Sequence, residues 1–239
     1  MNTKGPARKQ AAEEASSELL KNYKQKWNKA VPVNLSALAF TLNARIERIK
    51  EVNGGARLVP IPKGFLVLVS DKLEPARHRT SVAHELAHTL FYSQSAESPT
   101  RLIPHSADEE YFCFDVARRL LAPSWLLEYL GLHRESDLVV TFETFAGKLQ
   151  LSKSISAQLI FNDYELVRGA AGRWTWNGHG WALKKASFWA NPAMRQTERK
   201  FLRIIMQEAL AGTRPSSTYR VITIKENRSD TALVLVEKR

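Results

Sequence analysis

The residues best suited to chemistry are His84, Glu85 and His88, which form the pattern H-E-x-x-H. On a helix, residues four apart lie on the same face, so both imidazoles can reach one divalent metal ion at about 2.0–2.1 Å. Glu85 projects beside the metal and not onto it, where its carboxylate can hold and deprotonate a water molecule. The spacing therefore predicts a metal site whose third protein ligand comes from elsewhere in the chain.

The sequence around the motif predicts the helix that these ligands require. Pro75 can occupy the first helical position, and residues 76–91 contain no Gly or Pro. Val82, Leu86 and Leu90 form an apolar stripe, so we expect this helix to pack against a core. Histidines on an apolar face are more often core residues than ligands, but a glutamate at this position favours the metal site.

A second helix offers candidates for the third ligand. Ser106 and Glu109 form the pattern S-x-x-E, a capping box that begins a helix. Glu109 and Glu110 both fall within or at the rim of its apolar side, whereas Asp115 and Arg119 lie mostly opposite. A buried carboxylate needs a partner, so one acid is explained by the cap and the other is a candidate ligand. A first-turn acid is also favoured by the helix dipole alone, and periodicity does not decide between these interpretations.

Composition and charge limit the class of protein. The chain has 239 residues, 44% of them hydrophobic and 25% charged, which is typical of a soluble globular protein. The single cysteine, Cys113, excludes a disulfide framework within the chain and favours a cytoplasmic location. The first thirty residues lack an apolar signal core and no apolar run could span a bilayer, so we expect no membrane contact. The net charge of +11 suits DNA contact through a basic surface, or serves solubility alone.

The pattern along the chain predicts an α+β protein. Residues 1–12 are expected to form a disordered basic tail, and residues 13–135 a domain built around the H-E-x-x-H motif. Within that domain, residues 44–69 predict a small antiparallel meander beside the motif helix. An edge strand in such a sheet commonly aligns a peptide substrate by strand addition. Residues 136–168 are expected to be helical. Residues 169–239 are expected to form an α+β extension, whose tryptophans favour an aromatic core over a binding surface.

Three segments in this order resemble the ImmA/IrrE family of metallo-endopeptidases. They are Val31–Asn34 before a short helix, Arg79–Leu90 around the H-E-x-x-H motif, and Glu110–Pro123. The last segment is similar to the family pattern E-x-x-A-N/D-x-F-A-x-x-L-L-x-P. Phe114 replaces the usual Asn or Asp of that pattern, which weakens the polar support of the site but leaves the acidic ligand in place.

The resemblance implies a zincin-like domain in which His84, His88 and Glu110 hold zinc and Glu85 is the base. It favours Glu110 over Glu109 as the third ligand. Such ligands also accept other divalent ions, for example Mn²⁺. Members of the family typically cut a helix-turn-helix repressor, often encoded next to them, and so release genes of the stress response or of mobile elements. The resemblance therefore implies a regulatory protease with a protein substrate.

A hydrogen-bond donor to the developing oxyanion is also expected in a peptidase. His105 and Tyr111 lie close in sequence to Glu110, and either could serve. Neither belongs to a motif, so a purely structural role is open for both.

Residues 142–152 resemble the first helix and turn of a helix-turn-helix, with Gln150 where the turn usually carries Gly. Residues 153–160 would form the second helix. This helix offers little of the Arg, Asn and Gln that read base edges. Its composition favours a helical hairpin that packs against protein over one that reads DNA.

Two rival functions stay open. In the first, the protein is a DNA-binding regulator whose metal site is sensory or structural, and residues 141–165 contact the duplex. In the second, a toxin or defence protease with the same chemistry cuts a host protein. Salt-dependent duplex binding would identify the first rival, and the neighbouring genes would identify the second.

Overall fold

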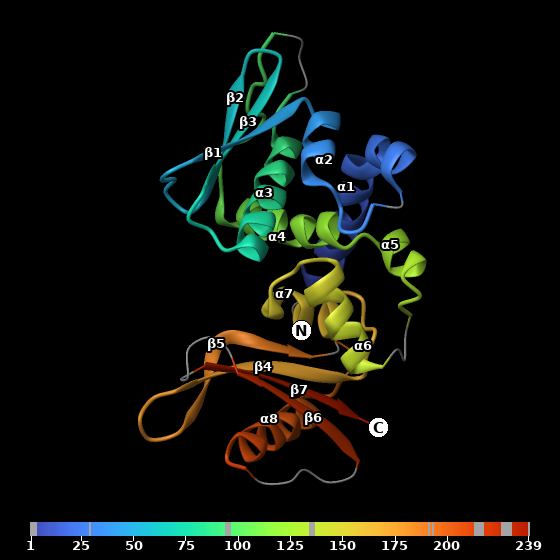
Figure 1. The fold of residues 1–239 in the computed structure, drawn as a ribbon, viewed down its shortest axis with the longest axis vertical. Coiled ribbons are helices and arrows are strands. Elements are labelled where there is room, and N and C mark those ends of the chain that lie inside the picture. Colours follow the sequence, from blue (N-terminus) through green and yellow to red (C-terminus); the bar gives the residue numbers. More distant parts are fainter. Residues whose placement is uncertain are drawn as a thin grey trace. The chain divides into compact units, whose positions relative to one another are not determined.

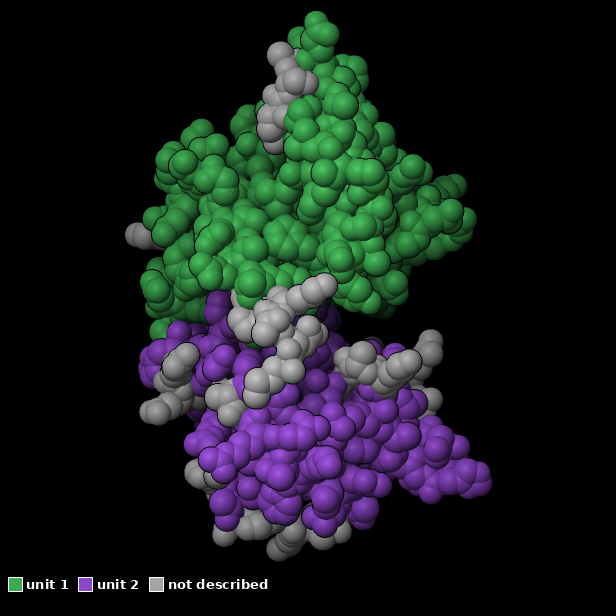
Figure 2. Space-filling view, turned by 180° about the vertical axis from the view of Figure 1, so that it is seen from behind, with its two compact units in different colours: residues 1–131, 147–151 green, residues 132–146, 152–239 purple. Residues whose placement is uncertain are grey.

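The computed structural model describes residues 4–28, 30–93, 97–133, 137–190, 192, 194–212, 218–225 and 231–238 (Figure 1). The chain folds into two compact units (Figure 2). Unit 1 comprises residues 1–131 and 147–151, and unit 2 comprises residues 132–146 and 152–239. Each unit has its own sheet and its own helices, so the predicted α+β class is confirmed. None of the described helices is long and apolar enough to cross a membrane.

Unit 1 begins with a helix that is longer than predicted. Helix α1 spans Lys4–Trp27, so the disordered tail expected over residues 1–12 is wrong from residue 4 onward. Tertiary contacts explain the difference. Ala12 is fully buried, and the Arg8 Nε lies 2.7 Å from the carboxylate of Asp115. Residues that looked solvated in the sequence therefore gain packing and an ion pair when they are helical.

Helix α4 (Ala107–Leu121) lies against α1, and this contact buries a side that was expected to be polar. Asp115 and Arg119 are 6% and 4% exposed. The Arg119 Nε donates a hydrogen bond to Glu13 at 2.8 Å. The predicted start of α4 is confirmed, because Ser106 caps it by accepting from a backbone N–H of the first turn. A short helix, α5 (Ser124–Tyr129), follows.

The sheet of unit 1 is mixed, so the predicted antiparallel meander is wrong. Strands β1 (Ala44–Ile49), β2 (Ala56–Ile61) and β3 (Gly64–Ser70) lie in the order β1-β3-β2, with β1 parallel to β3 and β2 antiparallel to it. Two residues join β2 to β3, which allows only an antiparallel pair. Strand β3 lies at the centre of the sheet because it is the most apolar and most buried of the three strands. Its Phe65 and Val67 side chains belong to the hydrophobic core. Strand β2 is consequently an edge strand.

The motif helix lies between this sheet and α4. Helix α3 (Pro75–Ala87) packs against β2 and β3 on one side and against α4 on the other. It begins at Pro75 as predicted and continues as a 3-10 helix over His88–Phe91. Helix α2 (Leu35–Thr41) also contacts α3, and Asn34 caps it by accepting from two backbone N–H groups.

Unit 2 contains an antiparallel four-stranded sheet in the order β5-β4-β7-β6. Its strands are β4 (Gly169–Trp176), β5 (Trp181–Ala190), β6 (Tyr219–Lys225) and β7 (Thr231–Lys238), and helix α8 (Gln196–Leu210) packs on them. The predicted aromatic core is confirmed for Trp174, which is 4% exposed beside Met206, and in part for Trp181, which is partly buried against the same cluster, whereas Trp176 is 44% exposed.

The helical region expected over residues 136–168 consists of two short helices, each extended by a π-helical turn. They are α6 (Leu138–Glu143) with Thr144–Lys148, and α7 (Lys153–Gln158) with Leu159–Asp163. Gln150, between them, has a φ of 55°, the left-handed conformation for which glycine is favoured. Residues 152–168 belong to the same compact unit as the strands that follow them, and the separate boundary at residues 168 and 169 stays a prediction.

Candidate metal centre

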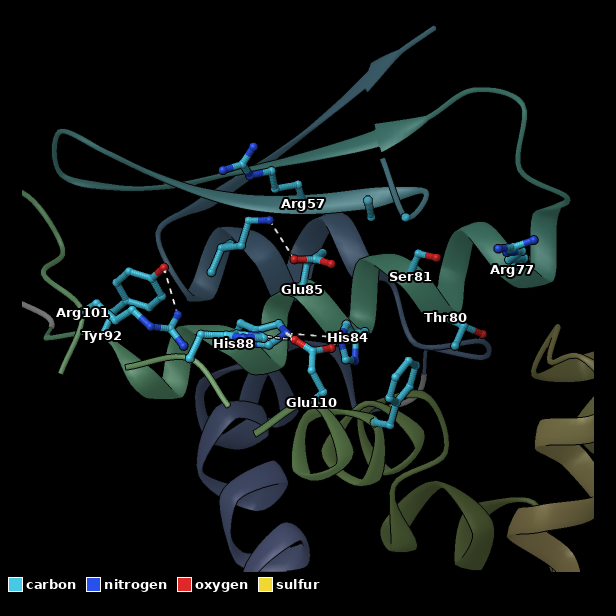
Figure 3. A pocket seen from close by; sticks show the side chains of 15 residues that line it. Arg57, Arg77, Thr80, Ser81, His84, Glu85, His88, Tyr92, Arg101 and Glu110 are labelled. Carbon is cyan, nitrogen blue, oxygen red and sulfur yellow. Dashed lines mark hydrogen bonds and ion pairs between the residues drawn. The ribbon is translucent and has the colours of Figure 1, made fainter. Parts of the chain in front are cut away.

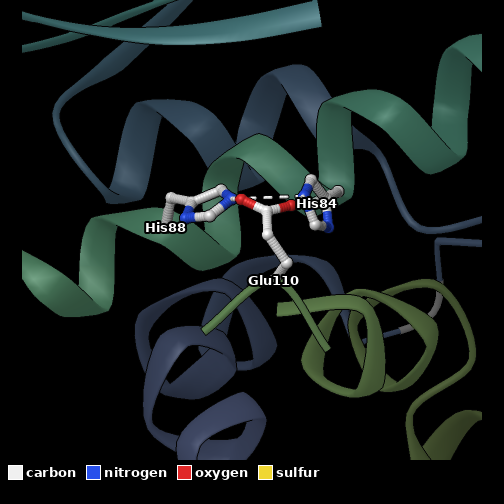
Figure 4. Close-up of side chains that lie close together, drawn as sticks. All are labelled: His84, His88 and Glu110. Atoms are coloured by element: carbon white, nitrogen blue, oxygen red, sulfur yellow. Dashed lines mark hydrogen bonds and ion pairs between the residues drawn. The ribbon is translucent and has the colours of Figure 1, made fainter. Parts of the chain in front are cut away.

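Three side chains converge between α3 and α4 (Figure 4). The Nε2 of His84 lies 3.1 Å from the Nε2 of His88 and 3.0 Å from one oxygen of Glu110. The other oxygen of Glu110 lies 3.3 Å from the Nε2 of His88. His84 comes from α3, His88 from the start of the 3-10 helix that continues it, and Glu110 from the first turn of α4. The structure therefore brings together the three residues that were predicted as ligands.

The donor set fits a divalent metal ion. Ligand atoms bound at about 2.0–2.1 Å to a tetrahedral centre lie about 3.3–3.4 Å apart, close to the separations seen here. Burial, followed by the charge of His88, lowers the pKa of His84, which keeps its imidazole neutral as metal binding requires. Partial burial alone would raise the pKa of Glu110, but the hydrogen bond with His105 and the charges of both ligand histidines lower it on balance. Two nitrogens and a carboxylate suit zinc, and they also accept Mn²⁺.

Glu109 contacts the ring nitrogen of His88 that is not directed at Glu110. The Nδ1 of His88 lies 2.7 Å from one oxygen of Glu109, and Arg101 donates a hydrogen bond to the other. An ionised carboxylate only accepts, so we assign the proton to Nδ1, which leaves the lone pair of Nε2 facing the other ligands. The capping role expected for the Glu109 side chain is therefore wrong. Ser106 does accept from the Glu109 N–H, but the carboxylate turns to His88.

His84 has different surroundings. Its Nδ1 is buried and has no hydrogen-bond partner among the described residues. The ring centroid of Phe114 lies 4.0 Å from that of His84, with the planes tilted by 33°. Phe114 stands where the ImmA/IrrE pattern has Asn or Asp, whose side-chain oxygen can accept from an imidazole N–H. An apolar contact thus orients His84 at a place where the pattern would provide a polar one.

A second group of ligand types, His88, Glu109 and Cys113, lies on the buried side of the centre. Burial, followed by the charge of Glu109, raises the pKa of the Cys113 thiol, so the thiol stays protonated at neutral pH. Glu109 is already paired with Arg101. We therefore assign this group to the support of His88.

Glu85 lies beside the three ligands and under the edge strand (Figure 3). One of its oxygens accepts the backbone N–H of Leu58 in β2 at 2.7 Å. Burial raises the pKa of Glu85, and the charge of His88 and the Leu58 hydrogen bond offset part of that increase. A carboxylate with a raised pKa is a stronger base, as proton abstraction from water requires.

The ligands and Glu85 open into a cavity of about 700 Å³ between β2 and the motif helix. His105 also lines this cavity and contacts Glu110 through its Nε2. Tyr111 does not line it, and its side chain is 61% exposed. Of the two candidate oxyanion donors, only His105 therefore lies at the centre.

Two further groups at the site were not predicted from the sequence. Arg101 lies in a loop and belongs to no pattern, so no local signal could identify it as the partner of Glu109. The N–H of Leu58 could be identified only with the strand order in hand, since only an edge strand has unpaired backbone groups to offer.

Comparison with known proteins adds a likeness of fold. No family model and no curated protein matches the chain. Among solved structures, a Mycobacterium tuberculosis transcriptional regulator matches with a TM-score of 0.55 and 10% sequence identity, over 96% of this chain and 76% of the other. At this identity the likeness concerns the fold alone. The resemblance to the ImmA/IrrE family continues to rest on the motifs.

Proposed function

We propose that the protein is a zincin-like metallo-endopeptidase of the ImmA/IrrE type. The observation that carries this proposal is the convergence of His84, His88 and Glu110, with Glu85 beside them in an open cavity under an edge strand. Zinc is the metal that this donor set suits best, with Mn²⁺ as an alternative. A metal site that only stabilised the fold would not need a carboxylate that is not itself a ligand, or a cavity next to its ligands.

Each residue has a role in peptide hydrolysis. A bound divalent ion supplies Lewis acidity, which polarises the scissile carbonyl and lowers the pKa of water. Glu85 accepts the proton of the attacking water and passes it to the leaving nitrogen, while the Leu58 N–H holds the carboxylate in position. His105 is the candidate donor to the oxyanion, because it reaches the cavity from the side of Glu110.

The edge strand supplies a means of aligning the substrate. The Leu58 N–H points away from β3 and toward Glu85, so the outer edge of β2 borders the cavity. An extended peptide can add to such an edge through its main chain. This arrangement suits cleavage within a polypeptide, because neither end of the substrate needs to enter the cavity.

The resemblance suggests a regulatory substrate, a helix-turn-helix repressor whose cleavage relieves repression. The solved structure that matches this fold is named a transcriptional regulator, which is in keeping with a role in gene regulation. The neighbouring genes are the first place to look for the substrate.

The decisive experiment compares the zinc-loaded wild type with Glu85→Gln. Each is incubated with the helix-turn-helix protein encoded beside it, and the products are identified by mass spectrometry. We expect the substitution to lower the rate by about 10²–10⁴-fold, the usual contribution of a general base, without loss of zinc. Glu47→Gln, the same change at an exposed position of β1, is the matched control. Equal cleavage by Glu85→Gln would exclude the mechanism.

A DNA-binding regulator is the second candidate. The left-handed backbone at Gln150, between two short helices, is the feature that favours it. Duplex binding by the Glu85→Gln protein that weakens steeply with salt would support this function, and no binding at low salt would remove it.

A further inference from the structure

The cavity contains more positive charge than its chemistry uses. Its lining carboxylates are Glu85 and Glu110, which serve as base and ligand in the proposed function. Arg101 also lines it but is held in an ion pair. Arg57 and Arg77 are exposed lining residues, and neither guanidinium has a hydrogen bond or ion pair with the described residues, although the charge of Arg57 acts to lower the pKa of Glu85. Two guanidinium groups are therefore available to a bound molecule.

Arg77 marks one end of the cavity (Figure 3). It shares a face of α3 with Ser81 and Glu85, since the three are spaced four residues apart, and all three line the cavity. Arg77 precedes His84 by seven residues, which is about 10.5 Å at 1.5 Å per residue. An extended peptide covers that distance in about three residues, at roughly 3.3–3.4 Å each.

We infer that the cavity selects peptides carrying Asp or Glu about three residues from the scissile bond, with Arg77 as the partner of that carboxylate. The planar guanidinium matches a carboxylate in two parallel hydrogen bonds, and the Ser81 hydroxyl offers a further donor on the same face. Arg57, on β2, is a second cation that favours an anionic peptide over a cationic one. The inference rests on the proposed function, because it uses the same cavity.

Cleavage of a synthetic decapeptide library with randomised residues tests this selection. The zinc-loaded wild type should cut with Asp or Glu enriched two to four residues from the bond, on one side. Replacing that acid by Ala should lower kcat/KM about fivefold, the upper range for a solvent-exposed ion pair. Arg77→Ala should abolish the preference, and Arg77→Glu should turn it into a preference for Lys or Arg. Arg45→Glu on β1, exposed and outside the cavity lining, should leave it unchanged.

A binding measurement separates this inference from the proposed function. Zinc-loaded Glu85→Gln is titrated into a fluorescein-labelled acidic decapeptide and into its Lys-substituted counterpart. Tighter binding of the acidic peptide, reversed by adding Arg77→Glu, would support the inference even if no peptide is cut, in which case only the protease proposal fails. Cleavage by the wild type with no acidic preference, or a preference that Arg77→Glu leaves intact, would overturn the inference alone.

Discussion

The two units differ in what they bury. Among the described residues, every Asp, Glu, His, Lys or Arg that is buried lies in unit 1: His84, His88, Glu109, Asp115, Arg118 and Arg119. The polar side chains buried in the described part of unit 2 are three hydroxyls, Thr141, Thr144 and Ser156. The rest of its interior is apolar, with Trp174 and Met206 between the sheet and α8.

This difference indicates where function lies. Burying an ionisable group is costly unless it is paired, and unit 1 pairs its groups in chains such as Arg101 to Glu109 to His88. Groups of this kind gather at sites that do chemistry. The interior of unit 2 resembles an ordinary packed core, so any binding by unit 2 would use its surface.

The largest expected effect distinguishes Glu109 from Glu110, because the sequence did not decide which of them is the third metal ligand. Glu110→Gln removes the proposed anionic ligand, whereas Glu109→Gln removes the proposed support of His88. We expect Glu109→Gln to weaken zinc binding by about 10–100-fold, as is usual for such supporting groups, and Glu110→Gln to weaken it more. Competition with a chromophoric chelator measures both. The reverse order would mean that Glu109, and not Glu110, is the ligand.

A core substitution in unit 2 tests whether its apolar interior contributes to stability and not to metal binding. Met206 is fully buried between the sheet and α8. Met206→Ala should lower the free energy of unfolding by about 2–5 kcal/mol, as large-to-small core changes do. Urea unfolding followed by tryptophan fluorescence measures this loss. The zinc affinity should not change, and a parallel loss of zinc would show that the division of roles between the units is wrong.

The smallest expected effect concerns how His84 is oriented at the candidate metal centre. Phe114→Asn should give the buried Nδ1 of His84 an acceptor, and so raise zinc affinity by about tenfold, at the lower end for such supports. Phe40→Asn, at an exposed position of α2, is the control. Unchanged affinity in Phe114→Asn would mean that ring stacking orients His84 as well as a hydrogen bond does.

Much of the local structure could be predicted from the sequence. The motif helix begins at Pro75 and α4 is capped by Ser106, because both signals act within one helical turn. The predictions that failed depended on contacts between residues far apart in the sequence. The tail became part of α1 through the contact of Arg8 with α4, and the order of the three strands followed from how deeply β3 is buried.

The sequence by itself determined that His84 and His88 share a helix face with Glu85 beside them, since the helical repeat makes this spacing a geometric fact. Only the tertiary structure decided which acid lies against both Nε2 atoms. Glu109 and Glu110 are adjacent on α4 and point about 100° apart, so the packing of α4 against α3 directs one to His88 Nδ1 and the other to both Nε2 atoms. The packing of α3 against the sheet placed Glu85 under Leu58, whose N–H is available because β2 lies at the edge of the assembled sheet.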